Sequence, residues 1–167
     1  MTMRRTPPDV ALELGRDQSE IEELFDKWRK PLRLKRNGRI APGLDKKIVT
    51  SWNGLAISAL SNGFIVSGDE KYLAAAENAA NFIWTSHTNP NGLLFRSSTD
   101  GHAANDGILD DYAFLAGGYL DLYEAGGDTI WLKRAIKLLE IAEQEFAHED
   151  HGYYQTARHV EAPLGPR

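Results

Sequence analysis

The 167-residue chain contains no cysteine. This absence excludes disulfides, thiolate metal sites, iron–sulfur clusters and cysteine nucleophiles, and it fits a cytoplasmic protein. The sequence also has no run of ~20 uninterrupted apolar residues, which a membrane-spanning helix needs. The start, "MTMRRTPPDV", has two arginines but no apolar stretch behind them, so it does not resemble a signal peptide. We therefore expect a cytoplasmic protein with no membrane partner.

Excess positive charge is also lacking, because the formal net charge is −5. The basic segment 27–39 is better explained as a solvated helix face than as a site for an anionic partner, so no nucleic acid is expected. Of the five histidines, His102 lies in a long predicted loop, and the other four show no spacing typical of metal ligands. The sequence predicts no metal and gives no sign of a cofactor.

Helical spacing of apolar residues dominates what is present. It predicts helices over 19–36, 48–67, 69–86, 109–125 and 128–148. Ser19 and Glu22 have the spacing of a capping box, and Pro31 is expected to end or kink the first helix. Gly68 suits the end of one helix, and Asp69 suits the N-cap of the next.

The same helical unit occurs twice, 59 residues apart. Leu55 aligns with Phe114, Ala76 with Ala135, and "GDEKYL" with "GDTIWL". In the second copy, residues 109–125 are apolar on most sides, whereas 128–147 carry one apolar stripe and a charged back. A helix that is apolar all round is buried, and a helix with one stripe lies outside.

This alternation of inner and outer helices predicts an all-α fold of α/α-hairpin repeats, with the layering of an α/α toroid or solenoid. Two full hairpins and a leading helix make up only part of a closed ring, so a toroid here is a partial α/α toroid. We expect one toroid-like domain over 19–157, with flexible segments at 1–18 and 158–167. The inner helices should then expose apolar surface, and this favours self-association or a loosely packed monomer.

Several motifs resemble a known family. "PGLDKKIVTSWNGLAISAL", "GILDDYAFLAGGYLDLYEAGGDTIWLKRA" and "GYYQT" are similar to the C-terminal region of the YyaL/spermatogenesis-associated family, also called thioredoxin-domain-containing proteins. The resemblance covers roughly 19–156, and "TSWNGL" and "DDYAFL" are its strongest marks. It implies a six-hairpin α/α toroid of the kind seen in glycosidases and N-acylglucosamine 2-epimerase. The family's thioredoxin-like part is absent here, so no redox role carries over.

Candidate functional residues gather on one predicted rim. The link over 87–109 is much longer than the ~4–6 residues usual in compact domains, and long loops carry function more often than short ones. Trp52 and Asn53 lie beside this rim, and Arg96 and His102 lie in the long link. All four are candidate substrate-binding residues. At most a short β-hairpin is expected, between Leu93–Arg96 and Tyr153–Thr156.

The pair Asp110 and Asp111 allows two interpretations. Both carboxylates can be structural, because Asp caps helix N-termini and favours their positive end. Alternatively, Asp110 caps the helix while Asp111 and Tyr112 point into a cavity as catalytic candidates, Asp111 as a general acid or base on a sugar. Trp52 and Asn53 would face them. The competing interpretation places the rings of Trp52 and Tyr112 in the core.

The resemblance leads to a carbohydrate-related function, with sugar epimerisation or isomerisation, or glycoside cleavage, as the chemistry and a small carbohydrate as the partner. The alternative is a non-catalytic scaffold whose rim binds another protein. A sugar site requires converging carboxylates and aromatic rings, whereas a scaffold requires a broad exposed apolar patch.

Overall fold

A computed structural model describes residues 5–150 and 152–160. The chain forms two compact units, Met1–Asp45 and Lys46–Arg167. The single domain expected over 19–157 is therefore wrong, because the boundary falls after Asp45. The proline- and glycine-containing stretch between the last helix of the first unit and the first strand of the second has no regular structure.

The first unit consists of helices α1 (Pro7–Leu14) and α2 (Gln18–Asn37). The helix α1 lies in the stretch expected to be flexible, and Thr6 and Asp9 form a capping box at its start. Asp17 caps α2 by accepting a hydrogen bond from the Ser19 amide at 2.8 Å, so the cap predicted at Ser19 is wrong. The helix also continues through Pro31, because a proline removes only one backbone donor and strong helix formers surround it.

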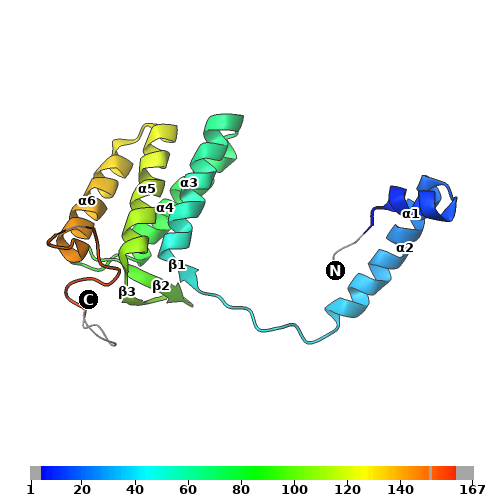
Figure 1. Cartoon of the computed structure of the whole chain (residues 1–167), viewed down its shortest axis with the longest axis horizontal. Coiled ribbons are helices and arrows are strands. Elements are labelled where there is room, and N and C mark those ends of the chain that lie inside the picture. Colours follow the sequence, from blue (N-terminus) through cyan, green and yellow to red (C-terminus); the bar gives the residue numbers. More distant parts are fainter. Residues whose placement is uncertain (1–4, 151, 161–167) are drawn as a thin grey trace. The chain divides into compact units, whose positions relative to one another are not determined.

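The second unit contains two α-helical hairpins (Figure 1). The first joins α3 (Thr50–Ser67) to α4 (Glu70–Ser86), and the second joins α5 (Leu109–Gly126) to α6 (Thr129–Phe146). In both tight turns a glycine adopts a left-handed conformation, with φ of +68° at Gly68 and +75° at Gly127. The next residue, Asp69 or Asp128, caps the outer helix. The predicted hairpins and their turns are confirmed.

The 59-residue repeat extends beyond the helices into the loops that follow them. The amide of Phe95 donates to the carbonyl of His87 at 2.8 Å, and the amide of Tyr154 donates to the carbonyl of Phe146 at 2.7 Å. Isolated β-bridges join Thr88 to Leu94 and, 59 residues later, Ala147 to Tyr153. Each outer helix therefore ends in the same local fold-back.

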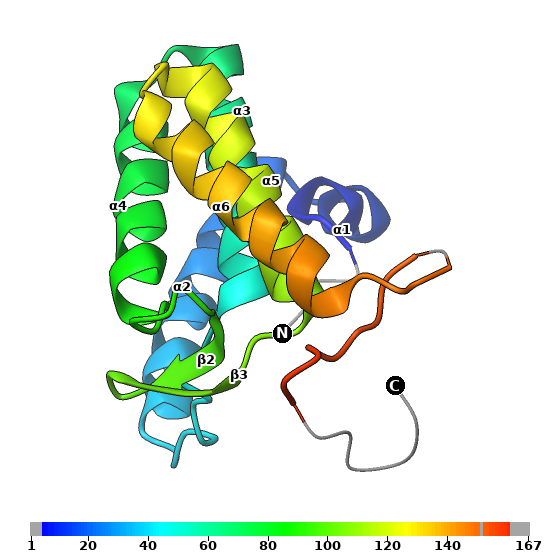
Figure 2. The same ribbon diagram turned by 90° about the vertical axis from the view of Figure 1, so that its left-hand side faces the viewer.

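This fold-back explains why one predicted pairing is wrong. Leu93–Arg96 and Tyr153–Thr156 do not pair with each other, because the chain in each repeat returns to its own outer helix. The sheet has the order β1–β2–β3, with β1 at Ile48–Val49, β2 at Phe95–Thr99 and β3 at His102–Asp106, and both pairings are antiparallel. It lies at the end of the hairpins where α3 and α5 begin (Figure 2).

The inner helices α3 and α5 pack closely against each other through glycine. A Cβ atom added at Gly54 would lie 2.5 Å from the carbonyl carbon of Phe114, and one at Gly118 would lie 2.5 Å from the carbonyl oxygen of Gly54. The core forms behind this contact, between inner and outer helices. Its largest fully buried apolar side chains are Tyr112, Tyr119, Phe146, Ile57, Ile83, Leu94, Leu115, Leu122 and Leu138.

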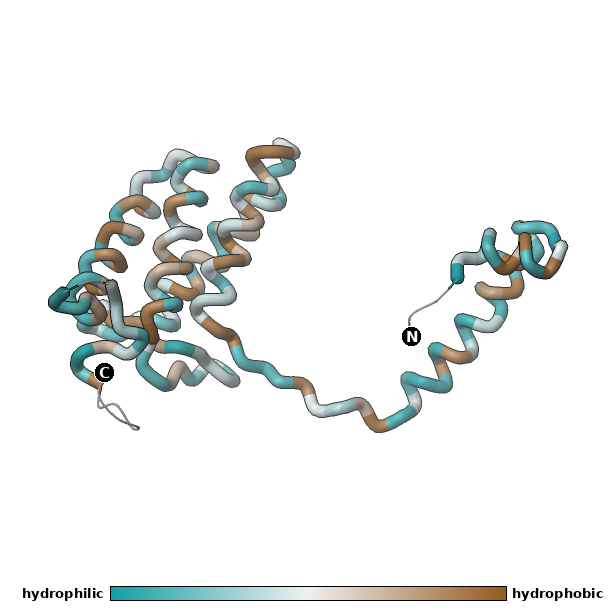
Figure 3. The backbone as a smooth tube through the Cα atoms, in the orientation of Figure 1, coloured by the Kyte–Doolittle hydropathy of each residue, from teal (hydrophilic) through white to brown (hydrophobic). Residues whose placement is uncertain are grey.

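Hydrophobic residues alternate with polar ones along each helix of the hairpins (Figure 3). Among the described residues, no helix combines the length and the apolar character needed to cross a membrane.

The glycine contact predicts a large difference between two alanine variants. Gly54→Ala forces the backbones of α3 and α5 apart, and we expect it to cost about 3 kcal/mol or more of unfolding free energy. Gly117→Ala is the control, because a Cβ there meets nothing within 4 Å. It should be neutral or gain up to about 1 kcal/mol from helix propensity. Urea unfolding measures both, and equal losses would contradict the close packing.

Candidate functional site

Asp111 joins the two inner helices at their N-terminal ends. Its carboxylate is fully buried, and Oδ1 accepts a hydrogen bond from the Ser51 amide of α3 at 2.9 Å. Its Oδ2 accepts from the Ile108 amide at 3.0 Å, so Asp111 caps its own helix as well. The expectation that Asp110 is the cap is wrong, because α5 begins at Leu109 and its third helical residue is Asp111.

Tyr112 is also part of the packed interior. Its hydroxyl oxygen accepts a hydrogen bond from the Leu94 amide at 2.9 Å, and its ring centroid lies 5.2 Å from that of Phe146. Burial raises the pKa of the Tyr112 hydroxyl, and the hydrogen bond from Leu94 partly opposes this shift. The arrangement holds the loop after α4 against α5 and keeps the hydroxyl protonated.

Trp52 and Asn53 do not face Asp111 and Tyr112. The ring of Trp52 is 70% exposed on the outside of α3. Asn53 donates through Nδ2 to the carbonyl oxygen of Val49 at 2.9 Å, within its own first turn. The four residues therefore do not form one pocket, and the placement of most of the Trp52 ring in the core is wrong.

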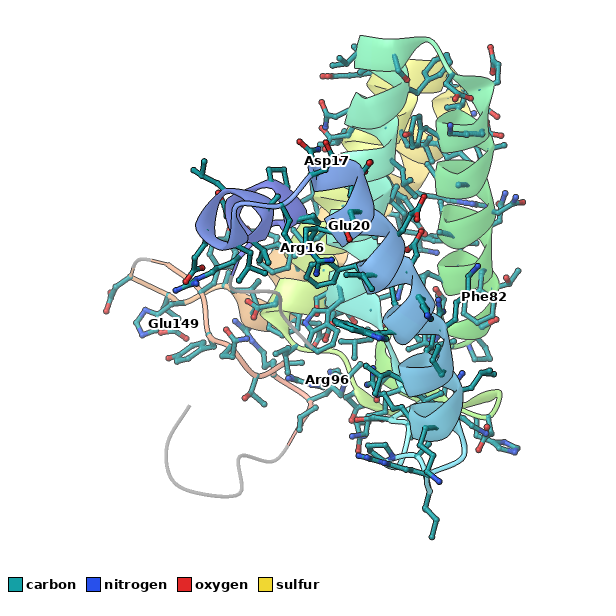
Figure 4. The ribbon with its side chains drawn as sticks, turned by 90° about the vertical axis from the view of Figure 1, so that its right-hand side faces the viewer. Arg16, Asp17, Glu20, Phe82, Arg96 and Glu149 are labelled. Carbon is teal, nitrogen blue, oxygen red and sulfur yellow. The ribbon has the colours of Figure 1, made fainter. Side chains whose placement is uncertain are left out.

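Arg96 on β2 (Figure 4) is exposed, and so is His102 on the neighbouring strand β3. His102 pairs with Thr99, which is three residues from Arg96 along β2. Side chains alternate between the two faces of a strand and rise ~3.3 Å per residue. The two side chains thus lie on opposite faces of the sheet, about 10 Å apart along it, and do not converge.

His87 is a buried polar centre that the sequence did not reveal. It follows α4, and its Nδ1 lies 2.8 Å from the hydroxyl of Thr50, while its Nε2 lies 2.8 Å from the hydroxyl of Ser98. The Thr50 hydroxyl donates to the Phe95 carbonyl, so it accepts from Nδ1–H, and Ser98 donates to Nε2. These contacts place a proton on Nδ1, burial lowers the pKa of the ring and so favours its neutral form, and the three side chains tie the sheet to α3 and α4.

The solvent side of the seam between α3 and α5 carries a different set of residues. Asp110, Phe114 and Asp121 follow each other at spacings of four and seven residues, which keeps them on one side of α5. Asp110 and Asp121 are half-buried, and the Phe114 ring is 41% exposed. The hydroxyl of Ser58 on α3 donates to the carboxylate of Asp121. Asp110 has no hydrogen-bond or ion-pair partner among the described residues.

We call these three α5 residues, Asp110, Phe114 and Asp121, the inner wall. It places the Phe114 ring one turn from Asp110 and about 10 Å along α5 from Asp121, so a ring and carboxylates share one exposed face, as in carbohydrate sites. The spacing of these three residues in the sequence already indicates that they share one face of α5. The sequence analysis missed this face because it assigned Asp110 to capping and Asp111 to the site. Across the residues that the structure describes, no group of three His, Cys, Asp or Glu side chains could hold a metal ion.

Paired inner helices, outer helices and long loops on one rim define the α/α-toroid class. No protein-family model matches the chain. It is 30% identical to human spermatogenesis-associated protein 20 over 99% of its length, and 35% identical over 81% of its length to an uncharacterised protein of Caenorhabditis elegans. The chain spans about a fifth of these relatives, 22% and 20%. It is a homologue of spermatogenesis-associated protein 20, of the YyaL-like family, which confirms the resemblance.

Solved structures confirm the fold. A cellobiose 2-epimerase from Spirochaeta thermophila has a TM-score of 0.63 and 20% identity over 75% of this chain. A sugar epimerase from a ruminal bacterium has a TM-score of 0.63 and 24% identity over 70% of this chain. The matched region is 34% and 31% of those two chains. At these identities the likeness shows the fold alone, and the chain is a partial α/α toroid.

Substitution of Asp111 should lower the free energy of unfolding more than substitution of Asp110. This order is the reverse of the one expected from the sequence. Asp111→Ala leaves two amides without their acceptor, and we expect a loss of about 2–4 kcal/mol. Asp111→Asn should also destabilise, because its NH₂ group faces an amide donor. Asp110→Ala should cost less than about 1 kcal/mol. Urea unfolding of the three variants measures this, and a larger loss for Asp110→Ala would refute the assignment.

His87 predicts a specific acid sensitivity. Burial lowers its pKa, and the charge of Asp111 partly opposes the shift. The unfolded chain then binds a proton at higher pH than the folded chain, so this stabilisation is complete above about pH 6.5 and decreases as pH falls toward the folded pKa. One proton gives a slope of at most about 1.4 kcal/mol per pH unit.

His87→Asn tests this sensitivity. The variant should be less stable at pH 7.5, and its unfolding free energy should fall less between pH 7 and pH 5 than that of the unchanged protein. His102→Gln is the control, because that histidine is exposed on β3. Parallel pH profiles for His87→Asn and the unchanged protein would exclude His87 as the source.

Proposed function

We propose that the inner wall is part of a carbohydrate-binding surface, and that the chemistry it serves is sugar epimerisation or isomerisation. The observation that carries this proposal is the placement of an exposed Phe114 ring between Asp110 and Asp121 on the open side of the inner helices. A pyranose packs its apolar face on such a ring and directs its hydroxyl groups to flanking carboxylates.

Three solved structures of similar fold support the choice of substrate class. They are two cellobiose 2-epimerases and a D-mannose isomerase, with TM-scores of 0.59, 0.63 and 0.55. Their named reactions all rearrange a sugar rather than cleave it. Because this chain corresponds to about a third of the length of each epimerase, it supplies part of a site.

Asp110 is the proton-transfer candidate of the inner wall. Its carboxylate has no partner among the described residues, and it lies in the first turn of α5, at the rim where the long loops gather. A carboxylate transfers a proton only if substrate can reach it, and Asp111 fails this condition because it is fully buried. The proposal thus moves the acid–base role from Asp111 to Asp110.

Ligand-detected NMR tests the proposal with the full chain and with cellobiose and mannose as probes. We expect weak binding that falls at least tenfold in Phe114→Ala and Asp110→Asn. Phe82→Ala is the matched control, because the Phe82 ring is 42% exposed on the outer helix α4 (Figure 4). Absence of saturation transfer from the unchanged protein to either sugar, or an equal loss in Phe82→Ala, would overturn the proposal.

A further inference from the structure

The buried polar centre at His87 has a counterpart in the second hairpin that contains no titratable group. The equivalent residues, 59 positions apart, are His87 and Phe146, Thr50 and Leu109, and Ser98 and Ala157. Phe146 and Ala157 are buried in the apolar core, whereas His87 and Ser98 are buried and joined by a hydrogen bond. The same three positions therefore attach a loop to its hairpin through polar groups in one repeat and through apolar packing in the other.

The polar centre holds a two-stranded segment whose base is fixed in the core. We call residues 95–106, which form the antiparallel strands β2 and β3, the flap. Directly before it Leu94 is fully buried, and directly after it the Gly107 amide donates to the Leu94 carbonyl at 2.7 Å. These two residues close the base of the flap, so the strands can move about this base while the core stays packed.

The attachments of the flap above its base are mostly polar. Within the flap, every residue of which the structure describes, only Ser98 is buried. The backbone of β2 pairs with the two residues of β1, and an exposed ion pair joins Asp100 to Lys46. Exposed ion pairs contribute little stability. The hydrogen bond between Ser98 and His87 therefore has a large share in holding the flap closed.

Protonation of His87 opposes this attachment. In the neutral ring Nε2 accepts from the Ser98 hydroxyl, but in the charged ring Nε2 carries a proton, so the hydroxyl must turn and its own proton loses its acceptor. Burial lowers the pKa of His87, and the charge of Asp111 on α5 partly opposes this shift. The other neighbours, Thr50 of α3, Phe82 of α4 and Ser98 of β2, are uncharged.

We propose that the flap is a pH-controlled lid, which is closed while His87 is neutral and opens about its base when His87 takes up a proton. Opening separates Ser98 from His87 and moves the strands at the end of the hairpins where α3 and α5 begin (Figure 2). The open form binds the proton more readily, so closure is fully favoured above about pH 6.5, and the open population rises at most about tenfold for each pH unit below it. The corresponding contact of the second hairpin cannot respond, because Phe146 takes up no proton.

Hydrogen exchange of the full chain at pH 7.5 and pH 5 tests the proposal. Protection factors, which correct for the intrinsic effect of pH on exchange, are compared for residues 95–106 and for the central turns of α5. The flap should be less protected than α5 at both pH values, because it opens without unfolding of the hairpins. Its protection should fall by about tenfold from pH 7.5 to pH 5. Equal protection of the flap and α5, or flap protection that does not change with pH, would overturn the proposal.

Replacing the polar centre by its counterparts from the second hairpin gives the matched control. The triple variant Thr50→Leu, His87→Phe, Ser98→Ala should show the same flap protection at both pH values. His102→Gln removes the histidine of the flap itself, which is exposed on β3, and should keep the full response. Ser98→Ala alone removes one hydrogen bond and should lower flap protection at pH 7.5 by about fivefold, which gives a test that does not depend on folding of the triple variant.

Three results with these variants count against the lid. They are a full pH response in the triple variant, loss of the response in His102→Gln, and unchanged flap protection in Ser98→Ala. None of these measurements involves a sugar, so the lid and the carbohydrate-binding surface are tested separately.

Discussion

The close approach of α3 and α5 is the constraint on which the rest of the hairpin unit depends. The backbones meet where Gly54 and Gly118 lack a side chain, and Asp111 then reaches across to the Ser51 amide. This hydrogen bond can form only if the first turns of α3 and α5 lie side by side. Because the helices are parallel, their first turns and the loops before them lie together at one end. The long loops therefore gather at one end of the unit because α3 and α5 are in close contact there.

The contact between α3 and α5 also determines which side chains stay accessible to a ligand. A side chain that closes the contact has its polar atoms engaged and is out of reach of solvent, as Asp111 and Tyr112 are. The side chains of their neighbours Asp110 and Phe114 lie on the solvent side of the contact between α3 and α5 and stay accessible. Consecutive residues of a helix are rotated by ~100° about its axis. This rotation places the Asp111 carboxylate in the contact between the helices and the Asp110 carboxylate in reach of solvent.

In the first hairpin, polar contacts hold the loops at this end of the unit. Thr50, His87 and Ser98 come from a helix start, a helix end and a strand, and their hydrogen bonds connect the sheet to both helices of the first hairpin. The second hairpin has Phe146 at the position of His87, packed on Tyr112. Equivalent positions of the two repeats thus stabilise the same fold-back by different means.

The sequence by itself determined the four helices of the hairpins, their turns and the repeat, although it did not reveal α1. These features depend on local spacing, on glycines with positive φ and on Asp at N-caps, and all of these can be recognised in a single chain. The register of "DDYAFL" could not be derived in this way, because either aspartate can occupy a first helical turn. Only the packing of α5 on α3 decided that Asp111 turns inward and Asp110 stays accessible. The polar centre at His87 also required the tertiary structure, since its partners lie 37 and 11 residues away along the chain.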